Sequence, residues 1–274
     1  MGQLTHSFQV TDDCIGFKTI LVNLYVIQIE GRVIMVDAGV SLSASTLRAW
    51  FRNKFQKETP DAVILTHAHF DHIGAISSFL QHGEFPIYLH ENERTYAEGN
   101  PYLPPDPTVG GGALALSSIL YPRKCESFAA HVRVLSGEEG AIDLLPGWTW
   151  FSTPGHTPGH ISLFRELDRL LLAGDALTTV KQESLVAVWK QEQILHGPPQ
   201  YYTPDWIAAE ESARWIVSKR PTHLATGHGV PMKGDMLPHQ LDQYVDEFKR
   251  LAVPKKGRYV HTQDTNSIKG TSSP

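Results

Sequence analysis

Three histidines and an aspartate crowd into six positions of this chain, in the segment HAHFDH. They are His67, His69, Asp71 and His72. Buried imidazoles lose their solvation, and protonated imidazoles repel one another, so such crowding needs a favourable partner. Imidazole nitrogen and carboxylate oxygen suit Zn²⁺, and also Fe or Mn. The segment therefore predicts a metal site, and a cluster of surface histidines is the alternative interpretation.

The spacing within this segment allows more than one ion. His67 and His69 can point the same way from an extended stretch of chain. Asp71 and His72 lie beyond them, on the turn into a helix, and can reach a neighbouring point. Two-metal hydrolytic sites hold their ions roughly 3.5–4 Å apart. One short segment can therefore serve two metals.

Three further candidate ligands follow other expected strands. His156 comes after WTWFSTPG, Asp175 after RLLLAG and His228 after THLATG. Loop-borne sites are usually built from such positions, on loops that a rigid scaffold holds in place. We therefore expect these side chains to converge with the first cluster at one edge of the fold.

The elements that would position these residues alternate along the chain. The first half predicts a hairpin of strands near 20–29 and 33–37, a helix at 43–55, a strand ending at 66 or 67, and a helix at about 73–82. In the second half, we expect strands at 131–136, 141–146, 148–155, 160–166, 169–175 and 222–229, and helices at 204–219 and 238–253. Two runs of strands, each followed by helices, favour an αββα sandwich of the α/β (α+β) class.

The chain shows no linker and no repeat, so we expect a single domain over residues 1–274. Residues 99–122 hold five prolines and four glycines, which indicates a long loop with a short helix at ALALSSIL. A second insertion is expected near 177–203, and a polar tail from about 262. Both insertions are candidate lids, and a surface insertion without a role is the alternative for the first.

Composition limits the classes of function. The chain has 41% hydrophobic and 19% charged residues and a net charge of -5, which is typical of a soluble globular protein and disfavours nucleic-acid binding. The N-terminus has no basic segment followed by an apolar run, and no stretch approaches the roughly 20 apolar residues of a membrane helix. Two distant cysteines, Cys14 and Cys125, favour a reducing cytoplasm. We expect a small-molecule substrate, no nucleic-acid or membrane partner, and a homodimer as an open option.

The motifs THAHFDHIG, TPGHTPGHIS, LLAGDAL and ATGHG occur in this order, and together they resemble the metallo-β-lactamase superfamily over roughly residues 20 to 232. The resemblance implies an αββα fold with a dinuclear metal site at one edge. The implied ligands are His67, His69 and His156 for one metal, Asp71, His72 and His228 for the other, and Asp175 as the bridge between them.

Details of the motifs indicate which branch of the superfamily the chain resembles most. His69 stands where flavodiiron oxygen reductases carry glutamate, and Asp71 with His72 differs from the cysteine-containing second site of antibiotic-destroying lactamases. RNA-processing nucleases of the β-CASP type need a large inserted domain, for which this chain has no room. The best match is the group of glyoxalase II, N-acyl homoserine lactone lactonases and related esterases or phosphotriesterases. The basic C-terminal patch of glyoxalase II is not evident beyond PKKGRY, residues 254–259.

The resemblance and the ligand set together predict a metal-dependent hydrolase with two divalent ions, Zn²⁺ first and Fe or Mn as alternatives. A hydroxide held between the two ions would attack a small ester, lactone, thioester or phosphotriester, and Asp71 would take or return a proton. The alternatives are a persulfide dioxygenase with a single iron and a metal-binding protein without turnover.

Four neighbours have open roles. His160 follows His156 by four positions and is expected to support the site rather than to bind metal. Asp37 ends a strand and either orients a ligand imidazole or only forms a turn. Tyr201 and Tyr202 either assist the substrate oxygen or form the wall of the pocket.

Overall fold

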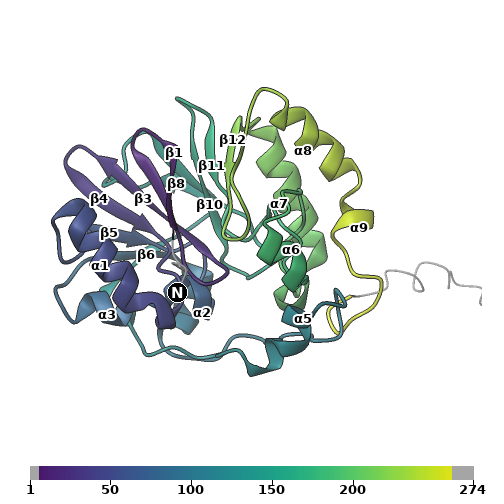
Figure 1. Cartoon of the computed structure of the whole chain (residues 1–274), viewed down its shortest axis with the longest axis horizontal. Coiled ribbons are helices and arrows are strands. Elements are labelled where there is room, and N and C mark those ends of the chain that lie inside the picture. Colours follow the sequence, from purple (N-terminus) through teal and green to yellow (C-terminus); the bar gives the residue numbers. More distant parts are fainter. Residues whose placement is uncertain (1–5, 261–274) are drawn as a thin grey trace, which may run out of the picture.

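The computed structural model describes residues 6–260, so the expected polar tail from about 262 lies outside the described residues. Two β-sheets lie face to face, and helices cover the outer surface of each (Figure 1). The observed architecture confirms the expected αββα sandwich. Within residues 6–260, no helix has both the length and the apolar character needed to cross a bilayer.

The first sheet follows the order of the chain. Its strands are β1 His6–Thr11, β2 Cys14–Lys18, β3 Asn23–Ile29, β4 Arg32–Val36, β5 Ala62–Ile64, β6 Ile87–His90 and β7 Val132–Leu135. Neighbours from β1 to β4 are antiparallel, and neighbours from β4 to β7 are parallel. The turn between β3 and β4 contains Glu30 and Gly31, both at positive φ, as the expected hairpin requires. Because β4, β5 and β6 run in parallel, the residues after them emerge at the same edge of the sheet.

The second sheet is built from the later part of the chain. Its strands are β8 Glu139–Ala141, β9 Trp148–Ser152, β10 Ile161–Arg165, β11 Leu170–Leu172, β12 His223–Ala225 and β13 Met232–Lys233, in the order β13-β12-β11-β10-β9-β8. Strands β11 and β12 are parallel. The loops after these two strands therefore also leave the sheet at a common edge.

Helices and short 3₁₀ turns connect the strands. The α-helices are α1 Ala44–Phe55, α2 Phe70–Ile73, α3 Ile76–Leu80, α4 Arg94–Ala97, α5 Ala113–Ser117, α6 Leu185–Lys190, α7 Trp206–Ser218, α8 Leu237–Asp246 and α9 Phe248–Leu251. The 3₁₀ turns are η1 Ser41–Ser43, η2 Glu91–Glu93, η3 Ser118–Leu120, η4 Ala129–His131 and η5 Gln200–Tyr202.

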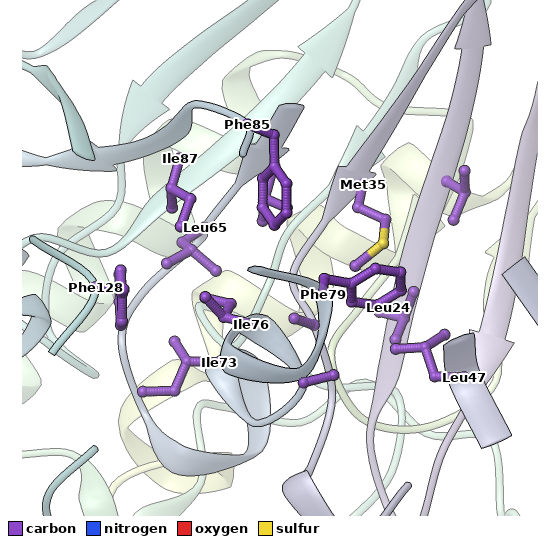
Figure 2. Packing of buried hydrophobic residues seen from close by; sticks show 14 of the residues in the cluster. Leu24, Met35, Leu47, Leu65, Ile73, Ile76, Phe79, Phe85, Ile87 and Phe128 are labelled. Carbon is purple, nitrogen blue, oxygen red and sulfur yellow. The ribbon is translucent and has the colours of Figure 1, made fainter. Parts of the chain in front are cut away.

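Three hydrophobic layers hold the sandwich together. Between the sheets, residues such as Ile34 and Leu172 are fully or almost fully buried. Outside the first sheet, Leu47 of α1 and Phe79 of α3 pack against strand residues such as Met35 (Figure 2). Helices α7 and α8 cover the second sheet in the same way. Burial on both faces explains why the central strands are continuous apolar runs.

Several local predictions differ from the structure. The helix expected at about 73–82 is shorter in the structure, where α3 covers Ile76–Leu80, and residues 70–73 form the separate helix α2. The strand expected at 141–146 is wrong: β8 ends at Ala141, and Ile142 and Leu145 fill the inter-sheet core from a turn. Apolar residues can therefore be buried without belonging to a strand. Strands β1, β2 and β13 were not expected, because strands of two to six residues carry little periodic signal.

Candidate metal centre

The segment after β5 presents its ligands from two directions. His69 has extended backbone dihedral angles, and α2 begins at the next residue, so His72 lies one turn further on. The carboxylate of Asp37, at the end of β4, accepts hydrogen bonds from the backbone N–H of Thr66 at 2.8 Å and from His72 Nδ1 at 2.8 Å. Thr66 Oγ1 also bonds to Asp37 and lies 3.1 Å from His67 Nδ1. Asp37 therefore orients ligand imidazoles, the first of its two expected roles, and leaves Nε2 of His72 free to face the site.

The first group consists of three histidines that meet from two loops. His67 Nε2 lies 3.1 Å from His69 Nδ1, and His69 Nδ1 lies 2.9 Å from His156 Nε2. All three side chains are buried. Three imidazole nitrogens facing one point form the ligand set of a typical tetrahedral zinc site with one open position.

The second group joins the same segment to the loop after β12. His228 Nε2 lies 3.5 Å from Asp71 Oδ2, and His72 Nε2 lies 4.0 Å from the same oxygen. Of these three side chains Asp71 is the most exposed. One carboxylate and two imidazoles again form a donor set suited to a divalent ion.

Asp175 lies between the two groups. Its Oδ2 is 3.1 Å from His228 Nε2 and 3.6 Å from His156 Nε2, while its Oδ1 is 3.5 Å from His72 Nε2. The structure thus brings together all seven residues that the sequence selected. Each of the three groups His67–His69–His156, His67–His72–Asp175 and Asp71–His72–His228 has its ligand atoms within 4.8 Å of one another.

Two buried atoms without hydrogen-bond partners provide evidence for metal binding that does not depend on the sequence motifs. His72 Nε2 and Asp175 Oδ1 are buried and have no hydrogen-bond partner, although an unsatisfied buried polar atom costs about 1–3 kcal/mol. A cation bound between them would satisfy both atoms. A Cβ atom on Gly227 would lie 2.1 Å from Asp175 Oδ1, so only glycine leaves room for this carboxylate.

Outer hydrogen bonds fix the tautomers of the remaining ligands. His156 Nδ1 lies 3.2 Å from Thr203 Oγ1, and His228 Nδ1 donates to the carbonyl oxygen of Leu21 at 2.7 Å. Both contacts leave Nε2 directed into the site. Thr203 was not predicted as a contact of His156, because no sequence pattern connects residues 47 positions apart.

Electrostatics differ between the two groups. Burial lowers the pKa of His67 and His156 well below the usual value, and it lowers the pKa of His69 to about 3. Burial also acts to lower the pKa of His72 and His228, but neighbouring carboxylates, above all Asp175, raise both. In the absence of metal, burial therefore favours the neutral form of the first group, whereas the carboxylates favour the protonated form of His72 and His228.

The pKa values of two carboxyl groups in the site are shifted in opposite directions. Burial raises the pKa of Asp71. For Asp175 burial acts in the same direction, but His228 and His72 hold its pKa well below the usual value. The surroundings therefore favour the ionised form of Asp175, whereas burial favours the protonated form of Asp71.

His160 supports the site from outside. Its Nε2 accepts a hydrogen bond from the backbone N–H of Asp175 at 2.9 Å, and its Nδ1 lies 2.8 Å from Thr153 Oγ1. Both ring nitrogens are therefore engaged, and neither is left for a metal. This agrees with the supporting role expected for His160.

A cavity of about 460 Å³ opens onto the metal centre. His69, Asp71, His156, Asp175 and His228 form its floor. Both expected insertions contribute to its walls, which are lined by Leu114, Tyr121, Pro122, Gln182, Pro199, Tyr201 and Tyr202.

The C-terminal basic segment is bonded to the first insertion, the loop at 99–122. Arg258 donates from its backbone N–H to Asp106 and from Nη1 to the carbonyl oxygen of Pro105 at 3.2 Å. Tyr259 donates to the carbonyl oxygen of Pro104. The guanidinium of Arg258 thus bonds to the loop at 99–122 instead of extending as a free anion-binding group.

Comparisons with known proteins agree with this geometry. The sequence pattern described as the metallo-beta-lactamase superfamily matches residues 19–228. The chain is 42% identical over 235 residues to the probable metallo-hydrolase YflN of Bacillus subtilis (strain 168), which covers 83% of this chain and 88% of that protein. It is 33% identical over 149 residues to the hydroxyacylglutathione hydrolase of Salmonella typhi, which covers 54% of this chain and 43% of that protein.

A solved structure shows the same fold. The B3 metallo-beta-lactamase BLEG-1 is 25% identical to this chain and superimposes with a TM-score of 0.57, covering 88% of this chain and 96% of its own. The sequence pattern spans most of the chain and includes every residue of the metal centre. This chain therefore belongs to the metallo-β-lactamase superfamily.

Proposed function

We propose that this protein is a dinuclear metal-dependent hydrolase of a small ester, lactone, thioester or phosphotriester. The observation that carries the proposal is the position of Asp175, whose single carboxylate faces imidazoles of both ligand groups at 3.1–3.6 Å. A carboxylate between two three-residue groups is the arrangement that a bridging ligand needs. Zn²⁺ is the first choice for the ions, with Fe or Mn as alternatives.

Two divalent ions in such a site supply a hydroxide at neutral pH and polarise the substrate oxygen. The chain's own residues would do the rest. Asp71 lines the cavity, and its raised pKa suits it to take a proton and return it to the leaving group. The buried imidazoles and Asp175 hold their positions through the outer contacts to Asp37, Thr203 and His160.

The cavity walls support an uncharged, partly apolar substrate. Ile20, Leu42, Leu114 and Tyr121 contribute to them, and among the described residues that line the cavity there is no lysine or arginine. A strongly anionic substrate would lose its solvation without gaining a cationic partner. The tyrosine hydroxyl of Tyr202 is buried without a hydrogen-bond partner and could donate to a substrate oxygen.

The test combines metal analysis with an activity panel. Purified protein should contain close to two ions per chain, and chelation should abolish hydrolysis of a member of a panel of lactones, thioesters and phosphotriesters assayed with Zn²⁺, Mn²⁺ and Fe²⁺. Asp175→Ala should lose more than about 100-fold in activity, which exceeds the usual effect of outer ligand contacts. As a control, His82→Ala changes an exposed histidine outside the site.

Other outcomes would replace the proposal. One iron per chain together with oxidation of persulfide would identify a dioxygenase. Tight metal binding with no turnover on the panel would identify a metal-binding protein. A covalent acyl-enzyme trapped with a slow substrate would exclude direct attack by hydroxide.

Partners and location complete the proposal. A small molecule is the proposed partner, with neither nucleic acid nor membrane, and dimerisation is a prediction that light scattering can check. Cys14 and Cys125 are both free in the structure, which supports the proposed cytoplasmic location.

A further inference from the structure

Glu93 is a buried carboxylate with two long-range contacts. It ends η2, the turn that follows β6, and its side chain is completely shielded from solvent. Its Oε2 accepts a hydrogen bond from the backbone N–H of Ala68 at 3.0 Å. Its Oε1 accepts one from the backbone N–H of Gly159 at 2.9 Å. Each carboxylate oxygen therefore accepts a hydrogen bond from a different loop.

Both loops carry ligands of the first metal group. Ala68 lies between His67 and His69, and Gly159 lies in the same loop between β9 and β10 as His156. These histidines come from different sheets, and nothing in the local sequence fixes the distance between them. Glu93 connects the two loops directly, through the backbone next to the ligands.

The packing around this connection is close. A Cβ atom on Gly159 would lie 2.7 Å from Glu93 Cγ, so the loop can approach the carboxylate only because residue 159 is glycine. The neighbouring Asn92 Nδ2 donates to the carbonyl oxygen of Pro158 at 3.3 Å and adds a second link. Strand β6 is parallel to β5, which places Glu93 at the edge of the sheet from which residues 67–72 emerge.

The need for two acceptors explains the choice of residue. Both partners are N–H donors, and a carboxylate is the side chain of this length with two acceptor oxygens. A glutamine of the same size would turn an NH₂ group toward one of the two N–H groups and leave that donor unsatisfied. A buried acid without such donors would be costly.

We propose that Glu93 is a positioning residue for the first metal group, which sets the separation between His67 and His69 on one loop and His156 on the other. This inference rests on the proposed metal site. The second group, Asp71, His72 and His228, does not depend on this link, because Asp37 and Leu21 fix its imidazoles. Loss of Glu93 should therefore weaken one ion selectively.

The test measures the two binding steps separately in the full-length protein. Stepwise Zn²⁺ titration and the visible spectrum of the Co²⁺-substituted protein would be recorded for wild type, Glu93→Gln and Glu91→Gln. Glu91 belongs to the same turn, but its carboxylate is exposed. We expect Glu93→Gln to weaken one ion by about 10–100-fold, the range for outer contacts of ligands, and to leave the other unchanged. Glu91→Gln should behave as wild type.

A purely structural role would give a different pattern, because it would lower the melting temperature of the metal-free protein and weaken both ions to the same extent. Equal weakening, or wild-type binding of both ions in Glu93→Gln, would overturn the inference. If Glu93→Gln does not fold, Gly159→Ala tests the same link, since its added methyl group pushes against Glu93 while retaining the carboxylate. Gly159→Ala should then weaken the same single ion, and unchanged affinity would overturn the inference.

The test of Glu93 can be distinguished from the test of the proposed hydrolase activity. Two ions in the wild type without hydrolysis of any ester would refute the proposed activity and still allow the selective loss in Glu93→Gln to be measured. A wild type that binds no metal would overturn both.

Discussion

The backbone N–H of Asp175 donates a hydrogen bond to Nε2 of His160 at 2.9 Å. Asp175 faces both groups of candidate ligands, so this bond fixes the position of its carboxylate through its own backbone. His160 is held in turn by Thr153, whose hydroxyl lies 2.9 Å from Ser162 Oγ. The conformation of the loop after β11 therefore depends on a series of buried hydrogen bonds that includes Thr153, which follows β9, two strands away in the sheet.

Replacement of His160 by alanine should break this series of hydrogen bonds. Because the N–H of Asp175 would lose its acceptor, we expect metal affinity and hydrolysis to fall by about 10–100-fold, with all seven proposed ligands present. Metal content after dialysis and kcat/KM would be measured beside the exposed-site control His82→Ala. Full metal content and activity in His160→Ala would contradict this role.

Gly227 leaves space for the carboxylate of Asp175, the proposed bridge, and alanine at this position should remove that space. Its Cβ would lie 2.1 Å from Asp175 Oδ1 and 2.8 Å from His72 Cε1. We expect Gly227→Ala to lose more than about 100-fold in metal affinity, beyond the usual effect of an outer contact. The matched control is Gly83→Ala, whose Cβ would contact the side chain of Thr59, with the nearest atom, Cγ2, at 3.3 Å. Retention of both ions in Gly227→Ala would show that Asp175 is not confined as described.

The two ligand groups should respond differently to pH. Ligands must be deprotonated to bind metal, and the pKa values of His72 and His228 are raised, so binding to the second group has to displace protons. The pKa values of His67, His69 and His156 are lowered, so their affinity should stay constant at neutral pH. As the pH rises through the neutral range, affinity should rise for one ion only. Calorimetry in buffers of different ionisation enthalpy would count the released protons, and proton release in both steps would contradict the assignment.

Phe79 tests the packing between α3 and the first sheet. Its ring is fully buried and contacts Phe51 edge-on, with 5.4 Å between the ring centroids. Phe79→Ala should reduce the free energy of unfolding by about 3–5 kcal/mol, the usual cost of such a cavity. Denaturant unfolding of the metal-loaded protein would measure the loss. The exposed Leu167 provides the control, since Leu167→Ala should change stability by less than about 0.5 kcal/mol.

The sequence by itself determined which residues could bind metal and which fold class would carry them. His67, His69, Asp71 and His72 are recognisable because ligands on one short segment must follow a fixed spacing. His156, Asp175 and His228 are recognisable because each follows an apolar strand and lies next to glycine. These signals depend only on residues that are close together in the chain, so they can be recognised in the sequence.

Only the tertiary structure decided the contacts that hold those ligands in place. Glu93, Thr203 and the carbonyl group of Leu21 act on residues that are between 25 and 207 positions away. A single glutamate or threonine in a sequence gives no sign of such a partner, since any hydrogen-bond donor or acceptor would be compatible with the same motif. Whether these groups come within hydrogen-bond distance depends on how the two sheets and their loops pack, and that packing is a property of the whole chain.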